Sequence, residues 1–138
     1  MSILTTKSQI NIASAQDLHN KNYYCSSIHC SYYSCIQNIM HIILFNVGID
    51  NEKLKSDFRD FKKKNPENPG GLHEYYINVT VTYLKSKKLD VISFNKEIFK
   101  LKKTRTEADY LNIEMGYDDS RYSIQKADTI NKILQKAF

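Results

Sequence analysis

The sequence has few residues that break helices: 4 glycines and 2 prolines among 138 residues, and no tryptophan. All-β sandwiches and barrels need many tight turns, so this scarcity argues against them and favours an all-α fold. The length is that of one ordinary domain, which can bury a core without disulfides or a structural metal. We therefore expect a single helical domain over residues 1–138.

The sequence also lacks a long hydrophobic run. The longest, IMHIILF at residues 39–45, is interrupted by His41 and is far shorter than the roughly 20 residues that cross a bilayer. The first residues, MSILTTKSQINIAS, do not have the charged stretch and apolar run of a signal peptide. We expect a cytoplasmic protein with no membrane partner, whose three cysteines are reduced thiols rather than a disulfide framework.

Positive charge is concentrated in the middle of the chain. Residues 53–105 contain 14 Lys/Arg and 6 Asp/Glu, a local net charge of +8, whereas the rest of the chain sums to −3. Such a segment is typical of a surface that attracts phosphate groups. A lysine-rich face that only keeps the protein in solution is an equally good interpretation, because no aromatic residues are interleaved at a known spacing.

Apolar residues at steps of three and four predict the helices of the first half of the chain. Residues 20–24 interrupt this pattern, and Gly48 is suited to a left-handed cap at the end of the longest helix. The expected elements are a helix from Ser14, a long helix from about Asn22 to Phe45, a short helix capped by Asp50, and a loop at residues 62–71.

The second half contains one ambiguous segment, residues 72–88. Its apolar and aromatic residues alternate as in a strand, but those three and four apart also fit one face of a helix. A single strand without a partner cannot satisfy its backbone groups, so we interpret the segment as a helix. Further helices are expected at residues 94–111 and after a cap at Asp119 or Ser120, which gives four main helices and a short one.

The segment YYCSSIHCSYYSCIQNIMHIIL, residues 23–44, is rich in groups that can carry chemistry. Cysteine and histidine are common zinc ligands, but Cys25, Cys30 and Cys35 are spaced by five residues and point to different sides of a helix. Cys30 follows His29, yet sequence neighbours on a helix diverge rather than form a nucleophile and its base. We favour structural thiols over a metal site or a cysteine nucleophile, and expect no cofactor.

Two short motifs resemble HEPN-domain proteins. The run NYYCSSIHCSYYSCIQ is followed, near the carboxyl end, by RTEADY and a last amphipathic helix. In that family a long helix carries small residues and a tyrosine pair, and an arginine leads into an ADY segment. The matching residues are Tyr32, Tyr33, Arg105, Ala108, Asp109 and Tyr110, and the resemblance covers about residues 13–137.

The resemblance implies an up-and-down bundle of four to five helices that commonly forms a homodimer. Many members are metal-independent ribonucleases, often toxins paired with a nucleotidyltransferase-like antitoxin. Their active site places an arginine and a histidine on one stripe of the long helix. A guanidinium can hold the scissile phosphate while an imidazole transfers protons, so the resemblance implies RNA or a nucleotide as the ligand.

This chain differs from the family at both of those positions. Counted from the tyrosine pair, Cys30 takes the place of the arginine and Gln37 that of the histidine. The stripe itself persists, because Ser34 and His41 align with these two residues. A neutral thiol cannot clamp a phosphate, and a carboxamide has no titratable proton near neutral pH. We therefore expect the family's catalytic motif to be degenerate here.

The remaining motif residues have structural interpretations as well. Asp109 lies one turn after Arg105, so we expect Arg105 to pair with a carboxylate such as Asp109 or to anchor the helix packing. Tyr32 shares the apolar face of the long helix, so we expect its ring in the core, whereas Tyr33 is the better candidate for an exposed or interface position. The candidate interface or binding residues are Tyr33, Ser34, Arg105, Asp109 and Tyr110.

The leading hypothesis is a HEPN-like binding or assembly module, catalytically degenerate and homodimeric, that binds RNA, a nucleotide or a nucleotidyltransferase-like partner. The rival hypothesis is an active metal-independent ribonuclease, the toxin of a toxin–antitoxin pair, that uses displaced residues such as His41, His73 and Arg105. A third hypothesis places the function entirely in a complex with a nucleotidyltransferase-like neighbour.

Overall fold

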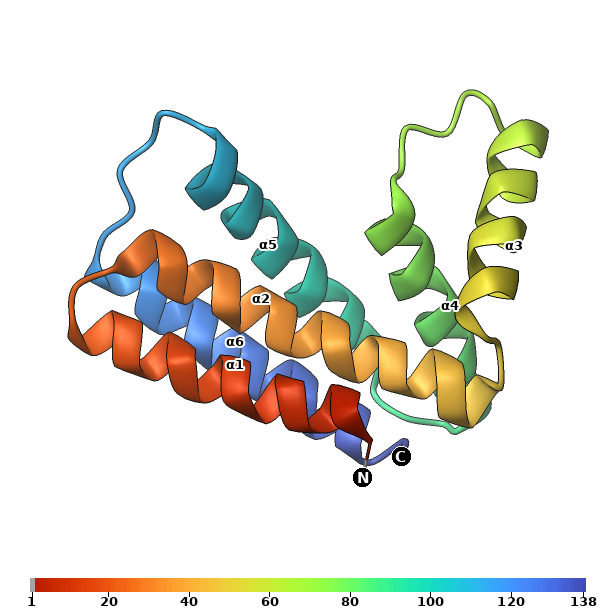
Figure 1. Cartoon of the computed structure of the whole chain (residues 1–138), viewed down its shortest axis with the longest axis horizontal. Coiled ribbons are helices and arrows are strands. Elements are labelled where there is room, and N and C mark those ends of the chain that lie inside the picture. Colours follow the sequence, from red (N-terminus) through yellow and green to blue (C-terminus); the bar gives the residue numbers. More distant parts are fainter. Residues whose placement is uncertain (1) are drawn as a thin grey trace.

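The computed structural model describes residues 2–138, and every regular element in this range is helical (Figure 1). The prediction of an all-α fold is confirmed, with six α-helices where four to five were expected. The elements are α1 (Ile3–Asn20), α2 (Tyr24–His41), the π-helix η1 (Ile42–Val47), α3 (Asn51–Lys64), α4 (Leu72–Ser86), α5 (Val91–Tyr110) and α6 (Tyr117–Gln135).

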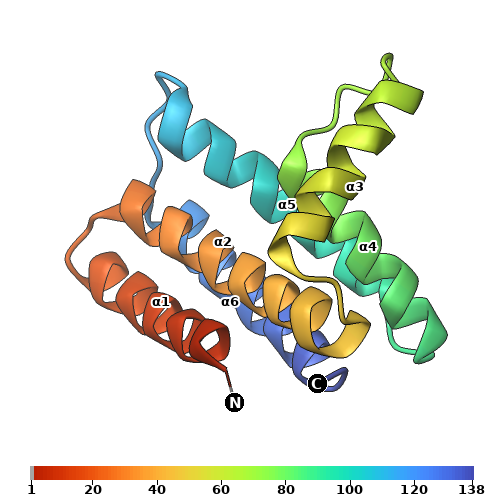
Figure 2. The ribbon, with the colours of Figure 1, turned by 45° about the vertical axis from the view of Figure 1, so that its right-hand side comes forward.

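The helices form two regions. α1, α2, α5 and α6 alternate in direction and make a bundle in which α1, α2 and α6 run side by side while α5 crosses α2 and α6 obliquely (Figures 1 and 2). α3 and α4 are inserted between α2 and α5 and stand beside the bundle at the end of α2 (Figure 1). We call α1, α2, α5 and α6 the bundle, and α3 with α4 the arm.

The first helix begins at Ile3, so its predicted start at Ser14 was wrong. Ser2 and Thr5 form a capping box, in which the Ser2 side chain accepts a hydrogen bond from the Thr5 backbone N–H at 3.3 Å. Apolar periodicity did not identify residues 3–13 as helical, because α1 buries small or polar residues against α2. Ser8, for example, is 3% exposed and donates its hydroxyl hydrogen to the Ser34 carbonyl oxygen at 2.7 Å.

The long second helix ends before Gly48, as predicted, but its last residues form a π-helix instead of an α-helix. After His41 the chain continues as η1, and Gly48 closes it in the left-handed conformation with φ of +83°. The glycine cap is therefore confirmed. The π-helix had no signal in the sequence, because i→i+5 bonding leaves the residue types of a helix unchanged.

Two other predictions concern the second half. Residues 72–88 were interpreted as a helix, and α4 confirms this. The last helix begins at Tyr117, ahead of the predicted cap at Asp119 or Ser120. Asp119 lies inside the first turn and accepts a hydrogen bond from the Gly116 backbone N–H at 2.9 Å, while Ser120 is buried against His19. The carboxylate thus stabilises the helix start from within it.

The core follows α2, which contacts α1, α4, α5 and α6. Ile28, Tyr32, Ile39 and Ile43 recur on one face of this helix and its extension and have no exposed surface, as the predicted apolar stripe requires. Among the described residues, no helix is both long enough and apolar enough to cross a membrane.

Candidate functional site

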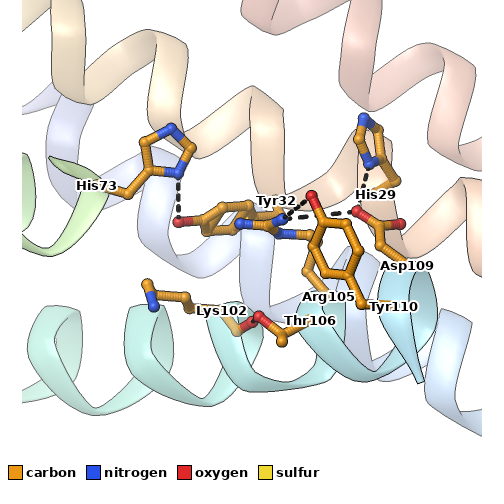
Figure 3. Close-up of polar contacts among 8 residues, drawn as sticks. All are labelled: His29, Tyr32, His73, Lys102, Arg105, Thr106, Asp109 and Tyr110. Atoms are coloured by element: carbon orange, nitrogen blue, oxygen red, sulfur yellow. Dashed lines mark hydrogen bonds and ion pairs between the residues drawn. The ribbon is translucent and has the colours of Figure 1, made fainter. Parts of the chain in front are cut away.

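A cluster of aromatic and charged residues lies where α2, α4 and α5 meet (Figure 3). α2 contributes the tyrosine pair, α4 contributes His73 near its first turn, and the last turns of α5 contribute the basic and acidic groups. We call this cluster the Arg105 site; its residues are His29, Tyr32, Tyr33, His73, Lys102, Arg105, Asp109 and Tyr110.

Arg105 is the centre of the site and is only 8% exposed. Its guanidinium carbon lies 4.7 Å from the ring centroid of Tyr32, 5.6 Å from that of Tyr33 and 5.7 Å from that of Tyr110. These distances suit cation–π attraction, which is stronger where water is excluded. Three rings therefore hold the guanidinium at the junction of α2 and α5.

The polar contacts of Arg105 leave one of its buried donors unused. Nη1 lies 3.6 Å from Asp109 Oδ2 and 3.5 Å from the Tyr110 hydroxyl oxygen, both longer than the usual 2.9 Å or so. Nε is buried and has no hydrogen-bond partner among the described residues. The predicted Arg105–Asp109 ion pair is confirmed, and it does not saturate the guanidinium, which has five N–H donors.

Asp109 also binds His29. His29 Nδ1 lies 2.8 Å from Asp109 Oδ2, and the His29 side chain is 48% exposed while that of Asp109 is 17% exposed. The imidazole also packs on the Tyr33 ring with 4.6 Å between centroids. The carboxylate therefore bridges Arg105 and His29, and it orients an imidazole whose Nε2 makes no hydrogen bond within residues 2–138.

On the other side of the guanidinium, His73 Nδ1 lies 3.1 Å from the Tyr32 hydroxyl oxygen. Burial lowers the pKa of His73, and the nearby charges of Arg105 and Lys102 lower it further. Burial also raises the pKa of Tyr32, so the phenol stays protonated. A protonated phenol therefore faces a neutral imidazole across this contact. Tyr32 is fully buried with its hydroxyl at the edge of the core, which confirms its predicted position.

The stripe of α2 that resembles the family's catalytic helix faces α1 and α6 instead. Ser34 is fully buried: its hydroxyl donates to the Ser31 carbonyl oxygen at 2.7 Å and accepts from Asn131 Nδ2 at 3.1 Å. Ser34, a candidate interface or binding residue from the sequence, is thus buried between helices of the chain itself. Gln37 Oε1 accepts a hydrogen bond from Asn11 Nδ2 at 2.9 Å. These side chains are occupied in helix packing.

The other two residues of this stripe, Cys30 and His41, lie far apart along α2. Burial raises the pKa of the Cys30 thiol, with a smaller effect from the Asp109 charge, which disfavours a thiolate. His41 lies nine residues after Tyr32, about 13 Å along the helix axis, and contacts Ser2 and Phe138. The structure thus brings His73 and Arg105 together and leaves His41 at a different site.

Sequence reasoning did not include His29 or Lys102 in the site. His29 is 80 residues from Asp109, and only the packing of α2 on α5 makes them neighbours. The spacing of His29 and Tyr33, one turn apart, was the available signal that they share a face. Among residues 2–138, no three His, Cys, Asp or Glu side chains are grouped so as to hold a metal ion.

Comparisons with protein-family models, with curated proteins and with solved structures find no match to this chain. The function of this chain is therefore inferred from the geometry of the Arg105 site.

Proposed function

We propose that the chain is a HEPN-like helical binding module, catalytically degenerate in the family's motif, that binds the phosphate groups of single-stranded RNA at the Arg105 site. The observation that supports this most is the unsaturated guanidinium. A guanidinium whose two Nη1 contacts are long, and whose Nε has no partner among residues 2–138, is suited to an additional oxyanion.

The surroundings of Arg105 favour an anionic ligand. Lys102 lies beside the site, and α5 also exposes Lys96, Lys100 and Lys103. Asp109 is the acidic member of the site. Single-stranded nucleic acid is bound by basic residues that follow the backbone and by aromatic rings that stack on bases. Tyr110 is 73% exposed beside the guanidinium and presents such a ring.

The test is binding of a fluorescein-labelled RNA 12-mer of mixed sequence, followed by anisotropy at several salt concentrations. We expect binding to weaken steeply with salt, because phosphate contacts release counterions. Lys102→Ala and Tyr110→Ala should each weaken binding about five- to 150-fold, since one phosphate contact or one stacked base contributes roughly 1–3 kcal/mol.

Lys126→Ala is the matched control, because Lys126 lies over Tyr122 on α6 and not at the Arg105 site. It should bind RNA like the unchanged chain. Equal losses in Lys126→Ala and Lys102→Ala would show only a general charge effect, and absence of binding at low salt would rule out the proposed function.

One observation favours a second candidate function, metal-independent RNA cleavage. His29 has one nitrogen held by Asp109 and the other without a partner in the part of the chain that the structure describes, and Arg105 contacts the same carboxylate. An oriented imidazole near a guanidinium is a suitable general acid or base. Incubation of an RNA pool without metal should decide: cleavage lost in His29→Ala and kept in His41→Ala would favour this candidate, whereas intact RNA would favour binding alone.

Homodimerisation and a nucleotidyltransferase-like partner are further parts of the proposal and are supported by the resemblance alone. Sedimentation equilibrium of the purified chain tests the first, and purification from its native cell tests the second. A monomer at all concentrations, recovered without a partner, would leave the Arg105 site as a free-standing RNA-binding surface.

A further inference from the structure

A separate cavity lies at the other end of α2, at His41. Its volume is about 570 Å³, within the range of cavities that hold small molecules. It is formed between α1, the end of α2 and the end of the chain, and among the described residues no Asp, Glu, Lys or Arg side chain lines it. The groups that it offers to a ligand come from Gln9, Asn38, His41, Gln135 and Phe138.

Asn38 supplies an unused acceptor at the floor of this cavity. The residue is 2% exposed, and its amide donates a hydrogen bond from Nδ2 to Asn131 Oδ1 at 2.9 Å. Within residues 2–138, Asn38 Oδ1 has no hydrogen-bond partner. This oxygen is not a fully buried atom, so a ligand N–H in the cavity can donate to it.

The rim and one wall have complementary chemistry. Gln9 and Gln135 are exposed and place carboxamides, each with a donor and an acceptor in one plane, at the cavity mouth. The rings of His41 and Phe138 lie 4.5 Å apart at 56° and form an aromatic wall. Burial is the main cause that lowers the pKa of His41, so this ring is neutral at pH 7.

The backbone at this position is unusual as well. The π-helix η1 begins directly after His41, whose Nδ1 lies 2.8 Å from the Ser2 hydroxyl oxygen. π-helices are rare and occur frequently at functional sites. The His41 ring is thereby fixed with Nδ1 occupied, which leaves Nε2 for another partner.

We propose that this cavity binds an uncharged, planar heteroaromatic amide. A ligand N–H donates to Asn38 Oδ1, the ligand ring packs on the Phe138 and His41 wall, and the amide edge pairs with a rim carboxamide. A charged analogue is disfavoured because no side chain of opposite charge lines the cavity and burial of an unpaired ion is costly. This inference does not depend on RNA binding at the Arg105 site.

The experiment is a titration of the ¹⁵N-labelled chain with nicotinamide, followed by NMR chemical shifts, with nicotinate as the matched charged analogue. We expect saturable shifts confined to residues 5–9, 38–41 and 135–138, with a millimolar Kd typical of a small fragment. Nicotinate should bind at least about tenfold more weakly. Absence of saturable shifts at about 20 mM, or equal binding of the two compounds, would overturn the proposal.

Variants at exposed positions keep the result interpretable. Phe138→Ala removes part of the aromatic wall and Gln9→Ala removes a rim carboxamide; each should weaken nicotinamide binding about threefold or more. Gln16→Ala, on the same helix but away from this cavity, is the control and should bind like the unchanged chain. Unchanged affinity in Phe138→Ala and Gln9→Ala would show that nicotinamide binds elsewhere. RNA binding by Phe138→Ala should stay normal.

Discussion

The bundle and the arm are stabilised by different kinds of contact. In the bundle, polar side chains join the helices in the core: Asn38 of α2 donates to Asn131 of α6, and Ser8 of α1 donates to the backbone of α2. In the arm, Phe58 and Phe61 of α3 pack on Tyr75 of α4, with ring centroids 5.5 and 5.4 Å apart. One apolar core includes residues of both regions; the bundle adds buried hydrogen bonds between its helices, and the arm adds aromatic packing between α3 and α4.

This difference has a structural consequence. A buried hydrogen bond tolerates little displacement, because a lost partner leaves a buried polar atom unpaired. Aromatic packing loses less when a helix shifts. We therefore expect the bundle to be the rigid part that holds Lys102, Arg105 and Tyr110, and the arm to be the more adaptable part. His73, which bonds Tyr32, joins the two regions.

The largest expected effect is a cavity in the bundle core. Ile39→Ala, at a fully buried position of α2, should lower the free energy of unfolding by about 3–4 kcal/mol. Leu54→Ala, at a fully buried position of α3, should cost about 2 kcal/mol, because α3 packs on fewer elements and can move into the space. Urea denaturation measures both, and equal losses would contradict the contrast between the regions.

The buried polar network should give the next largest effect. Asn131→Ala removes the partner of Asn38 and of the Ser34 hydroxyl, so the free energy of unfolding should fall by about 2 kcal/mol. Asn95→Ala, at an exposed position of α5, is the matched control and should change stability by less than about 0.5 kcal/mol. Similar values for the two variants in chemical denaturation would show that the network contributes little.

A smaller effect is expected at the junction of bundle and arm. Gly48 has φ of +83°, and an added Cβ would meet nothing within 4 Å. Gly48→Ala should therefore lose about 1 kcal/mol from backbone strain alone. Gly71→Ala inside the arm also has free space and no positive φ, so its thermal midpoint should fall less. If the thermal unfolding midpoint of Gly48→Ala equalled that of the unchanged chain, the left-handed backbone at this position would not be strained by a side chain.

The contact between the regions should respond to pH. The pKa of His73 is lowered in the folded chain, mainly by burial, so its contribution to stability is present above the unfolded pKa and is lost as pH falls through the folded value. The unfolding midpoint in urea should decrease from about pH 7.5 to about pH 5, and the decrease should be smaller in His73→Gln. His29→Gln, at an exposed position, is the control, and its unfolding midpoint should decrease towards low pH as in the unchanged chain. An unchanged decrease in His73→Gln would assign the effect to another group, such as His41.

Local chemistry made several features predictable. The scarcity of glycine and proline predicted the all-α class, and the apolar stripe of α2 predicted its buried face. Gly48 was identified as the left-handed cap, and the one-turn spacing of Arg105 and Asp109 predicted their ion pair. Each depends on residues within a turn or two of one another, where chain geometry fixes the distances.

Other features depended on contacts between distant segments. The start of α1 at Ile3 was missed because this helix buries small polar residues that only the neighbouring α2 accommodates. The burial of Ser34 was not predicted because one helix alone does not show which face α1 and α6 cover. The bridge from His29 through Asp109 to Arg105, and the cavity at His41 with its Asn38 side chain, exist only where separate helices pack.

The sequence by itself determined that this chain is helical, where its longest helix ends and which face of that helix is apolar. Tertiary structure decided which polar groups are paired and which remain free, because hydrogen bonding and burial of a side chain depend on neighbours far along the chain. For that reason the complete Arg105 site and the cavity at His41 became visible only in the folded protein.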